Sequence, residues 1–376
     1  MINLFQPALG EEELEAIKKV FESNWIGKGK LVATFEEKFA DNLKCDKSHF
    51  LSTTSCTEAI FLAAKIFNFQ PNDEIIVPSI SFPSIGSAIK ESGAKLVLCD
   101  VDASSLNVRV EDIEKVVSTK TKAVFVTHYG GVSCDMDPIL EFCKEHNIYV
   151  IEDAACAVQS FYKTRACGTL GDMAMWSFDA MKTLTAGDGG MIYIKDPLNR
   201  VRAQELLYLG LPAKQKSGLD SSENKSNNWW EFEMNEYGRR AIMNDITAAI
   251  AIEQLKKLPD FLKIRKEISD FYDTSLDGVG DLVLPQWDKT TMDSSYYFYW
   301  IQTNRRDELA KHLIDNGVYS TFRYWPLHKV ALFSDGLEYE NSEKVSSNTL
   351  NIPIHQGLSE KDRKKIVTTI KSFFEK

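Results

Sequence analysis

The chain has 376 residues, of which 44% are hydrophobic and 26% are charged, and its formal net charge is −10. This composition is typical of a globular protein long enough for two domains. The acidic balance argues against nucleic-acid binding through a basic patch. No apolar run approaches the roughly 20 residues that a membrane helix needs, and the first residues lack the pattern of a secretion signal.

Seven cysteines are present, and none of them forms a C-x-x-C pair. An odd number without such pairs argues against a disulfide framework or a zinc ribbon. We therefore expect reduced thiols, no metal site, no membrane association and a cytoplasmic location.

The first expected elements are two amphipathic helices at residues 11–24 and 29–43. Short apolar runs rich in β-branched residues then alternate with helical patterns. The expected strands lie within residues 48–55, 73–82, 95–102, 122–129, 148–154, 173–178 and 189–196, and the expected helices are 56–67, 83–93 and 136–147. This alternation predicts an α/β fold with a mostly parallel sheet covered by helices.

The alternation ends near Asp196. Residues 212–236 are a polar stretch that reads as a long irregular loop, and its two adjacent tryptophans suggest that it covers part of the protein. Residues 242–276 form a long helical pattern, in which Pro259 predicts a kink or a break.

The last third of the chain combines apolar strand-like runs with helical patterns and predicts a smaller α+β domain. We place a large domain at residues 1–245 and the small C-terminal domain at residues 246–376. The N-terminal helix falls within the range of the large domain. It can nevertheless pack on the small domain.

Lys182 lies in the stretch SFDAMKTLTAGDGG, after an apparently buried strand and before a glycine-rich turn. A lysine becomes a nucleophile toward carbonyls when desolvation or a nearby cation lowers its pKa. The alternative is an ordinary solvated lysine, and Lys182 taken alone does not decide between the two.

Asp153 ends the apolar run VIEDAAC, 29 residues before Lys182. Open α/β sheets bind ligands at the carboxyl ends of their strands. A carboxylate there can keep a pyridine nitrogen protonated and make the ring an electron sink, although a helix N-cap is an equally simple role.

A hydroxyl-rich turn, TTSCTEAI, leads from a strand into a helix. The backbone N–H groups of Cys56 and Thr57, with the hydroxyls of Ser55 and Thr57, suit a phosphate at a helix N-terminus, and Ser177 is a second phosphate donor. An ordinary Ser/Thr cap is the alternative. The sequence GKGK at residues 27–30 lacks the spacing of a phosphate loop.

Phe82 follows another strand end and can stack on a planar cofactor or pack in the core, and His128 is expected to be structural or near the site. Motifs of serine hydrolases, zinc proteases and dinucleotide-binding proteins are absent from the sequence. The order of phosphate turn, aromatic residue, strand-end aspartate, serine and lysine describes a pocket for pyridoxal 5′-phosphate (PLP).

The sequence also resembles the DegT-type sugar aminotransferases, which are PLP enzymes of the aspartate-aminotransferase fold (fold type I). The motifs that carry the resemblance are NWIGKGKLVATFEEKFA, SCTEAIFLAA, DEIIVPSISF, GAKLVLCDVD, THYGGVSCDMDPI, VIEDAAC, GTLGDMAMWSFDAMKTLTAGDGG, MNDITAAIAIEQLKKL and FRYWPLH. They run nearly from end to end, and the series as a whole is specific to the family. The resemblance implies a large domain built on a seven-stranded type of sheet.

The resemblance implies that Lys182 holds PLP as a Schiff base and carries the proton, while Asp153 pairs with the pyridinium nitrogen. The other implied cofactor contacts are Cys56, Thr57 and Ser177 to the phosphate, Phe82 stacked on the ring, Cys156 at the phenolic oxygen, and Arg240 reaching the phosphate of a partner subunit in a homodimer. Trp25, Arg323 and His328 are candidates for substrate contacts, Arg323 toward a nucleotide diphosphate.

Several positions depart from the family pattern. Asp179 stands where a histidine is usual, and Cys156 stands where Gln or His is common. Arg240 and Ile242 replace the usual residues after the glycine, and Cys56 replaces the glycine of an S-G-T motif. Cysteine is a much weaker hydrogen-bonding group than Gln or His, so these changes are expected to retune the chemistry or the sugar selectivity.

The resemblance thus implies an enzyme that moves an amino group from L-glutamate to a nucleotide-linked keto sugar, with a 4-keto-6-deoxyhexose as the expected acceptor. Pyridoxamine phosphate is expected to form between the two half-reactions. Such enzymes serve surface-polysaccharide, O-antigen or secondary-metabolite pathways. Amination at C3, a PLP-dependent sugar dehydratase and a non-catalytic regulatory relative remain alternatives. A related dehydratase branch replaces the lysine with histidine, so Lys182 favours transamination.

Overall fold

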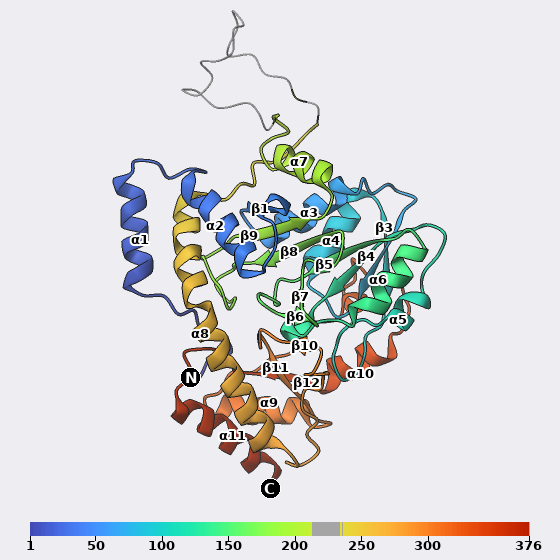
Figure 1. The fold of residues 1–376 in the computed structure, drawn as a ribbon. Coiled ribbons are helices and arrows are strands. Elements are labelled where there is room, and N and C mark those ends of the chain that lie inside the picture. Colours follow the sequence, from blue (N-terminus) through green and yellow to red (C-terminus); the bar gives the residue numbers. More distant parts are fainter. Residues whose placement is uncertain (213–233, 235, 376) are drawn as a thin grey trace, which may run out of the picture.

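The computed structural model describes residues 1–212, 234 and 236–375 (Figure 1). The predicted loop at residues 212–236, with its two tryptophans, lies almost entirely outside the described residues. A seven-stranded sheet forms the centre, in the order β1-β9-β8-β5-β4-β2-β3. These strands are β1 (Phe50–Thr53), β2 (Glu74–Pro78), β3 (Lys95–Cys99), β4 (Thr121–Thr127), β5 (Tyr149–Asp153), β8 (Met173–Ser177) and β9 (Gly190–Ile194).

The pairing in this sheet is parallel except at β9, which runs antiparallel to both of its neighbours. The mostly parallel, helix-covered sheet expected from the sequence is therefore confirmed. All residues of β2 and β9 are buried, as are most residues of the other five strands. Strands covered on both faces read as nearly continuous apolar runs, which is the pattern that the sequence shows.

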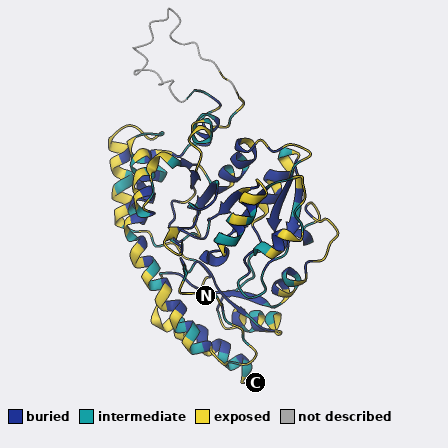
Figure 2. Cartoon of the chain, turned by 45° about the vertical axis from the view of Figure 1, so that its right-hand side comes forward, coloured by how far each residue is buried: buried dark blue, intermediate teal, exposed yellow. Residues whose placement is uncertain are grey.

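Helices cover both faces of the sheet and enclose two apolar cores (Figure 2). One core receives side chains from α2 (Lys30–Asn42), α5 (Val110–Glu114), α6 (Met136–Glu145) and the first half of α8 (Asp245–Leu276). The opposite core receives them from α3 (Cys56–Ile66), α4 (Pro83–Ser92) and α7 (Pro197–Leu206). Figure 2 shows the buried strands between helices whose outer surfaces are exposed.

The long helix α8 has 32 residues and connects the large sheet with the C-terminal part of the chain (Figure 1). It continues through Pro259, so the break that the sequence allowed at this position does not occur. Leu255, Leu258 and Phe261 are buried on either side of the proline. Their packing holds the helix together where proline removes one backbone hydrogen bond.

The N-terminal helix α1 (Glu11–Glu22) packs along the first half of α8. Gln254 Nε2 donates to Glu13 Oε1 at 2.8 Å, and Lys257 forms an ion pair with the same carboxylate at 2.8 Å. The partners of α1 on α8, Gln254 and Lys257, lie after residue 245, where we expected the small domain to begin.

The C-terminal part has its own apolar core below the large sheet (Figure 1). It is built from the antiparallel pair β11 (Tyr299–Gln302) and β12 (Thr349–Ile352), with α9 (Arg306–Asp315), α10 (Glu340–Asn348) and α11 (Glu360–Phe374). A three-stranded sheet of β6 (Phe161–Tyr162), β7 (Arg165–Ala166) and β10 (Met292–Asp293) joins the two parts. The sequence did not predict α7, β12 or this small sheet, because each is short or lacks a clear periodic pattern.

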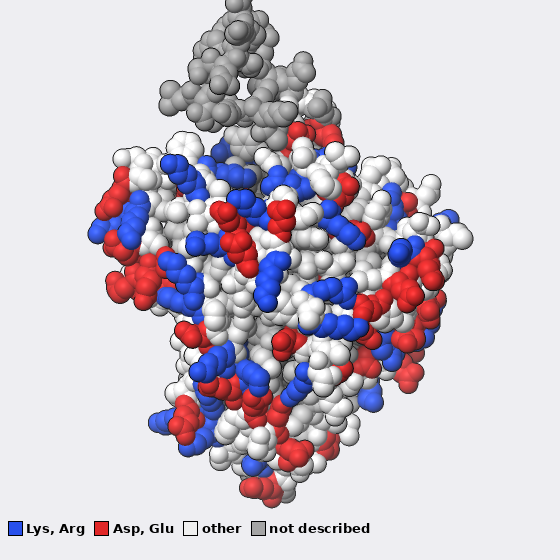
Figure 3. All heavy atoms as spheres, in the orientation of Figure 1, with Lys and Arg blue, Asp and Glu red and all other residues white. Residues whose placement is uncertain are grey.

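Basic and acidic side chains are interspersed on the face shown in Figure 3. Within the described ranges, no helix is long and apolar enough to cross a membrane.

Candidate active site

The candidate site lies where three neighbouring strands end. Thr127, Asp153 and Ser177 are the last residues of β4, β5 and β8. Side chains alternate between the faces of a strand, and Ile151 and Met175, two positions earlier on β5 and β8, pack in the core beneath α3 and α4. Asp153 and Ser177 therefore point to that same face. They line a cavity of about 280 Å³, near the lower end of the range for ligand pockets.

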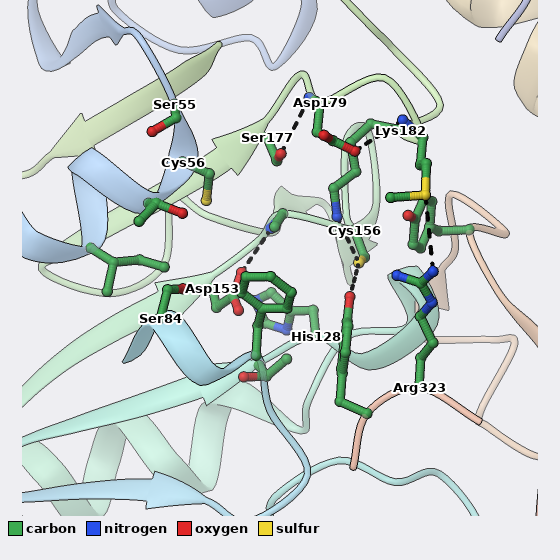
Figure 4. Close-up of a pocket in the computed structure, with 18 of the residues that line it drawn as sticks. Ser55, Cys56, Ser84, His128, Asp153, Cys156, Ser177, Asp179, Lys182 and Arg323 are labelled. Carbon is green, nitrogen blue, oxygen red and sulfur yellow. Dashed lines mark hydrogen bonds between the residues drawn. The ribbon is translucent and has the colours of Figure 1, made fainter. Parts of the chain in front are cut away.

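The cavity brings together eight of the residues predicted from the sequence (Figure 4). They are Cys56, Thr57, Phe82, Asp153, Cys156, Ser177, Lys182 and Arg323. Ser55 and His128 also line it. Their roles toward the cofactor stay predictions, but the fold places them around one space.

Lys182 lies on a turn that follows β8, and Asp179 closes this turn. Asp179 Oδ1 accepts a hydrogen bond from the backbone N–H of Met181 at 3.0 Å, and its carbonyl accepts one from the N–H of Lys182 at 2.9 Å. Side-chain capping of this kind is typical of aspartate in turns. The acid that replaces the usual histidine thus has a local structural role in presenting Lys182.

The amine of Lys182 points into the cavity between a thiol and an aromatic ring (Figure 4). Its Nζ lies 3.6 Å from Cys156 Sγ and 4.7 Å from the centre of the Tyr297 ring. Burial favours the neutral amine, but the acidic groups around it, Cys156 and Tyr297 first, outweigh burial and raise the pKa of Lys182. Lys182 is therefore protonated in the cofactor-free chain and must lose a proton before it can attack a carbonyl.

Asp153 is a buried carboxylate with few partners. Its Oδ1 accepts a hydrogen bond from the N–H of Ala155 at 3.0 Å. Burial raises the pKa of Asp153, whereas this hydrogen bond and the charges of Lys182 and His128 act in the opposite direction. A cation in the cavity, such as a protonated pyridine nitrogen, would stabilise the charged carboxylate.

The neighbouring acid, Glu152, belongs to the opposite face of β5 and is saturated with donors. Its two oxygens accept hydrogen bonds from the backbone N–H groups of Gly168, Leu170 and Gly171 at 2.6–2.8 Å. His128 Nε2 lies 2.9 Å from Glu152 Oε2. His128 Nδ1 accepts from a backbone N–H, so Nε2 carries the proton that Glu152 accepts. Glu152 therefore fixes the ring that forms part of the cavity wall.

The N-terminus of α3 provides a place for a phosphate. Ser55 is the N-cap, and its Oγ accepts from the N–H of Glu58 at 3.2 Å. The amides of Cys56 and Thr57 belong to the first turn of the helix, whose N–H groups have no partner within the helix. A Cβ on Gly190 would meet Cys56 N at 2.8 Å, so only glycine lets β9 pass so close to this turn.

Two buried hydroxyls in the cavity wall, Ser84 Oγ and Thr127 Oγ1, have no hydrogen-bond partner among the described residues. Buried polar groups are normally paired, so these oxygens indicate a polar ligand. Phe82 is 43% exposed and lies edge-on to Tyr324, with ring centres 5.5 Å apart. An amine, a partly paired carboxylate, a helix N-terminus and an available aromatic ring together fit PLP.

Three predicted residues lie elsewhere. Arg240 packs its guanidinium over the Tyr208 ring at 5.4 Å and does not line the cavity of its own chain. Trp25 is 57% exposed, and its indole N–H donates to a backbone carbonyl of the same turn. His328 is buried, with its ring nitrogens 2.6 Å from Ser79 Oγ and 2.9 Å from Glu343 Oε1. These partners give His328 a structural position, and its contact with substrate stays a prediction.

The sequence reasoning missed several residues of the cavity wall. Tyr297 lies just before β11, and Tyr324 lies in the FRYWPLH motif, with its hydroxyl 3.9 Å from Cys156 Sγ. Both belong to the C-terminal part, more than 100 residues after Lys182 in the chain. The aromatic run SYYFYWIQT was expected only to belong to the C-terminal α+β domain, and no local signal showed which of its rings would reach the cavity.

Comparison with known proteins agrees with this geometry. The model of the DegT/DnrJ/EryC1/StrS aminotransferase family matches residues 7–371. The chain is 43% identical to the dTDP-4-dehydro-2,3,6-trideoxy-D-glucose 4-aminotransferase of Saccharopolyspora spinosa, over 100% of this chain and 96% of the relative. It is 30% identical to the GDP-perosamine synthase of Escherichia coli O157:H7, over 99% and 98% of the two chains.

Solved structures show the same architecture. The aminotransferase TlmJ from Streptoalloteichus hindustanus matches with a TM-score of 0.93 and 42% identity, covering 99% of this chain and 98% of the other. The PLP form of Spr1654 from Streptococcus pneumoniae shares the fold at 24% identity, with a TM-score of 0.89 and 100% and 98% coverage. The chain therefore belongs to the DegT/DnrJ/EryC1/StrS aminotransferase family and is a sugar aminotransferase with PLP as its cofactor.

Proposed function

We propose that the protein transfers the amino group of L-glutamate to a nucleotide-linked 4-keto-6-deoxyhexose and thereby makes an amino sugar for a surface polysaccharide or a secondary metabolite. The observation that carries the proposal is the amine of Lys182 in a cavity with the buried carboxylate of Asp153. The name of the 43% identical relative, a 4-aminotransferase of a dTDP-linked dehydro sugar, supports amination at C4.

When bound, PLP supplies an electron sink that stabilises negative charge on the carbon undergoing proton transfer. Lys182 is the group that attaches the cofactor and then removes and returns the proton at that carbon as general base and acid. Asp153 keeps the pyridine nitrogen protonated. The amides of Cys56 and Thr57 and the hydroxyl of Ser177 are the ligands that we assign to the phosphate.

The remaining walls orient the ring and limit the access of water. Phe82 lies in the cavity wall and is partly exposed. Cys156 lies beside the Lys182 amine, where it can contact the phenolic oxygen of the cofactor. A thiol is a weak hydrogen-bonding group. We therefore expect Cys156 to hold that oxygen less firmly than an amide or imidazole would.

The proposal includes a homodimer that shares its active sites. Arg240 is exposed and lies outside the cavity of its own chain, which leaves its guanidinium available to the phosphate of a partner subunit. Trp25 is likewise exposed and remains a candidate for substrate contact across such an interface. Residues 1–245 would form the cofactor-binding domain, and residues 246–376 the small one.

We also place the enzyme in the cytoplasm. All seven cysteines are free, and six of them are buried. Reduced thiols are typical of proteins in a reducing compartment.

The test is product analysis with purified, PLP-loaded protein. The protein would be incubated with L-glutamate and matched panels of 4-keto and 3-keto nucleotide sugars, and the products would be examined by mass spectrometry and NMR. We expect amination at C4. Amination at C3, loss of water from the sugar, or the absence of any product would each contradict the proposal in a different way.

A further inference from the structure

Arg323 is a cation in the cavity wall that the assigned cofactor contacts leave unused. It lines the same cavity as Lys182, on the side formed by the C-terminal part of the chain (Figure 4). Within the described ranges, no carboxylate lies within ion-pair distance of its guanidinium. An arginine without an acidic partner at a cavity can take its counter-ion from a ligand.

Uncharged contacts hold the guanidinium in place. Its carbon lies 5.3 Å from the centre of the Phe5 ring, and one of its nitrogens lies 3.9 Å from Met181 Sδ. The backbone is fixed as well, because the N–H of Arg323 donates to Asn351 Oδ1 at 2.8 Å and its carbonyl accepts from the hydroxyl of Tyr129. Arg323 is thus oriented without neutralising its charge.

The balance of charges in the cavity gives this arginine particular weight. The acids that line the cavity are Asp153, Asp179 and Asp188, and the cations are Lys182 and Arg323. Lys182 is occupied by the cofactor and by proton transfer, and the whole chain carries a net charge of −10. Among the described residues that line the cavity, Arg323 is therefore the cation that remains to attract an anionic substrate.

Both substrates of the proposed function are anionic at a distance from the reacting carbon. L-Glutamate carries a second carboxylate at the end of its side chain, and the nucleotide sugar carries a diphosphate on the far side of its ring. The two substrates bind in turn to the same cavity, with the reacting carbon of each at Lys182. One arginine in the cavity wall can therefore meet both anions in succession.

We propose that Arg323 binds the side-chain carboxylate of the amino donor in the first half-reaction and the diphosphate of the sugar acceptor in the second. This inference rests on the proposed function and extends it. In this arrangement the single charge of Arg323 selects a dicarboxylic donor. A glutamine side chain has the same shape as that of glutamate but no carboxylate to pair with Arg323.

The first test compares L-glutamate with L-glutamine as donors. The change in absorbance of the bound PLP reports the first half-reaction without any sugar. We expect the unaltered protein to prefer glutamate by about 10- to 100-fold in kcat/KM, the range of a charge-assisted hydrogen bond. Arg323→Gln should remove this preference by slowing the reaction with glutamate alone, and Arg323→Lys should restore part of it.

The matched control is Arg305→Gln, because Arg305 is an exposed arginine that pairs with Glu308 on the protein surface. It should leave the ratio of the two donors unchanged, and all variants should keep the absorption spectrum of bound PLP. An unaltered protein that uses both donors equally well would overturn the inference. So would an Arg323→Gln variant that keeps the preference for glutamate.

The second test uses dTDP as a probe of the diphosphate site. We expect dTDP to compete with L-glutamate in the unaltered protein and to bind at least about 10-fold more weakly to Arg323→Gln. Equal inhibition of both proteins would contradict the shared site. Failure of the proposed function has a different signature: L-glutamate converts the cofactor, yet no keto sugar is aminated.

Discussion

Two consecutive acids, Glu152 and Asp153, end strand β5 and belong to opposite faces of the sheet. Glu152 lies in the supporting region, and Asp153 lies in the wall of the cavity. Glu152 and Asp153 are 0% and 5% exposed. Glu152 accepts hydrogen bonds from three backbone amides and His128, whereas Asp153 accepts one from a backbone amide. The same chemical group is thus fully paired on one face of the sheet and only partly paired on the other.

This difference in hydrogen-bond pairing separates residues that support the fold from residues that are free to bind a ligand. A fully paired buried carboxylate holds the chain around it in one arrangement, and its donors are lost only when the region unfolds. Asp153 is only partly paired, and Ser84 Oγ and Thr127 Oγ1 have no partner in the described part of the chain. These groups retain hydrogen-bonding capacity for a ligand. Incomplete pairing in a cavity is therefore the feature that marks the active site in this protein.

The largest effect is expected at Lys182. Lys182→Ala should lower the turnover of the PLP-loaded protein by at least about 10³-fold, because it removes the amine that attaches the cofactor and moves the proton. The melting temperature should change little, since the Lys182 side chain donates to no backbone group among the described residues. Steady-state kinetics and thermal unfolding would be measured side by side, and activity within about 10-fold of the unaltered protein would refute the assigned role.

Glu152→Gln is expected to damage stability instead. The amide places an –NH₂ group where the carboxylate accepted N–H donors, so at least one buried donor loses its partner. We expect a loss of about 3–5 kcal/mol in the free energy of unfolding. Urea unfolding would measure it, with Glu141→Gln at an exposed position of α6 as the control. A loss below about 1 kcal/mol would show that the network is not essential.

Asp153→Asn is expected to lower turnover without lowering stability. Because burial raises the pKa of Asp153, its contribution to stability is present below the unfolded pKa and is lost as the pH rises through the folded pKa. The cofactor-free Asn variant should therefore be at least as stable as the unaltered protein at pH 7. Its turnover should fall by about 10²-fold or more. A clear loss of stability with normal turnover would reverse the comparison.

His355 lies outside both regions and is expected to have a smaller, pH-dependent effect on the free energy of unfolding. Burial and the neighbouring charge of Arg265 lower the pKa of His355 to about 4. The unfolded chain then binds a proton at higher pH than the folded protein does, so stability should fall as the pH drops from about 6.5 to about 4, by up to about 3 kcal/mol. Chemical unfolding across this range would detect it, and His355→Gln should flatten the profile.

Much of the large domain was predictable from local pattern. Each strand of the seven-stranded sheet coincides with a predicted apolar run, with β4 beginning one residue earlier than predicted. The turn residues at Ser55 and Lys182 follow these strands. Many residues that line the cavity could be predicted because strand ends of a parallel sheet converge at one edge. Short elements of the C-terminal part, such as β12, were missed because they carry weak periodicity and are stabilised mainly by tertiary contacts.

The sequence by itself determined the fold class, the family and the strand-end residues that lie near Lys182, because these depend on the order of strands and on the identity of strand-end side chains. Only the tertiary structure decided that Glu152 and Asp153 differ in pairing, that His328 is held by Ser79 and Glu343, and that Arg323 reaches the cavity. The physical reason is that hydrogen-bond saturation and access to a cavity depend on segments distant in sequence, which no local pattern records.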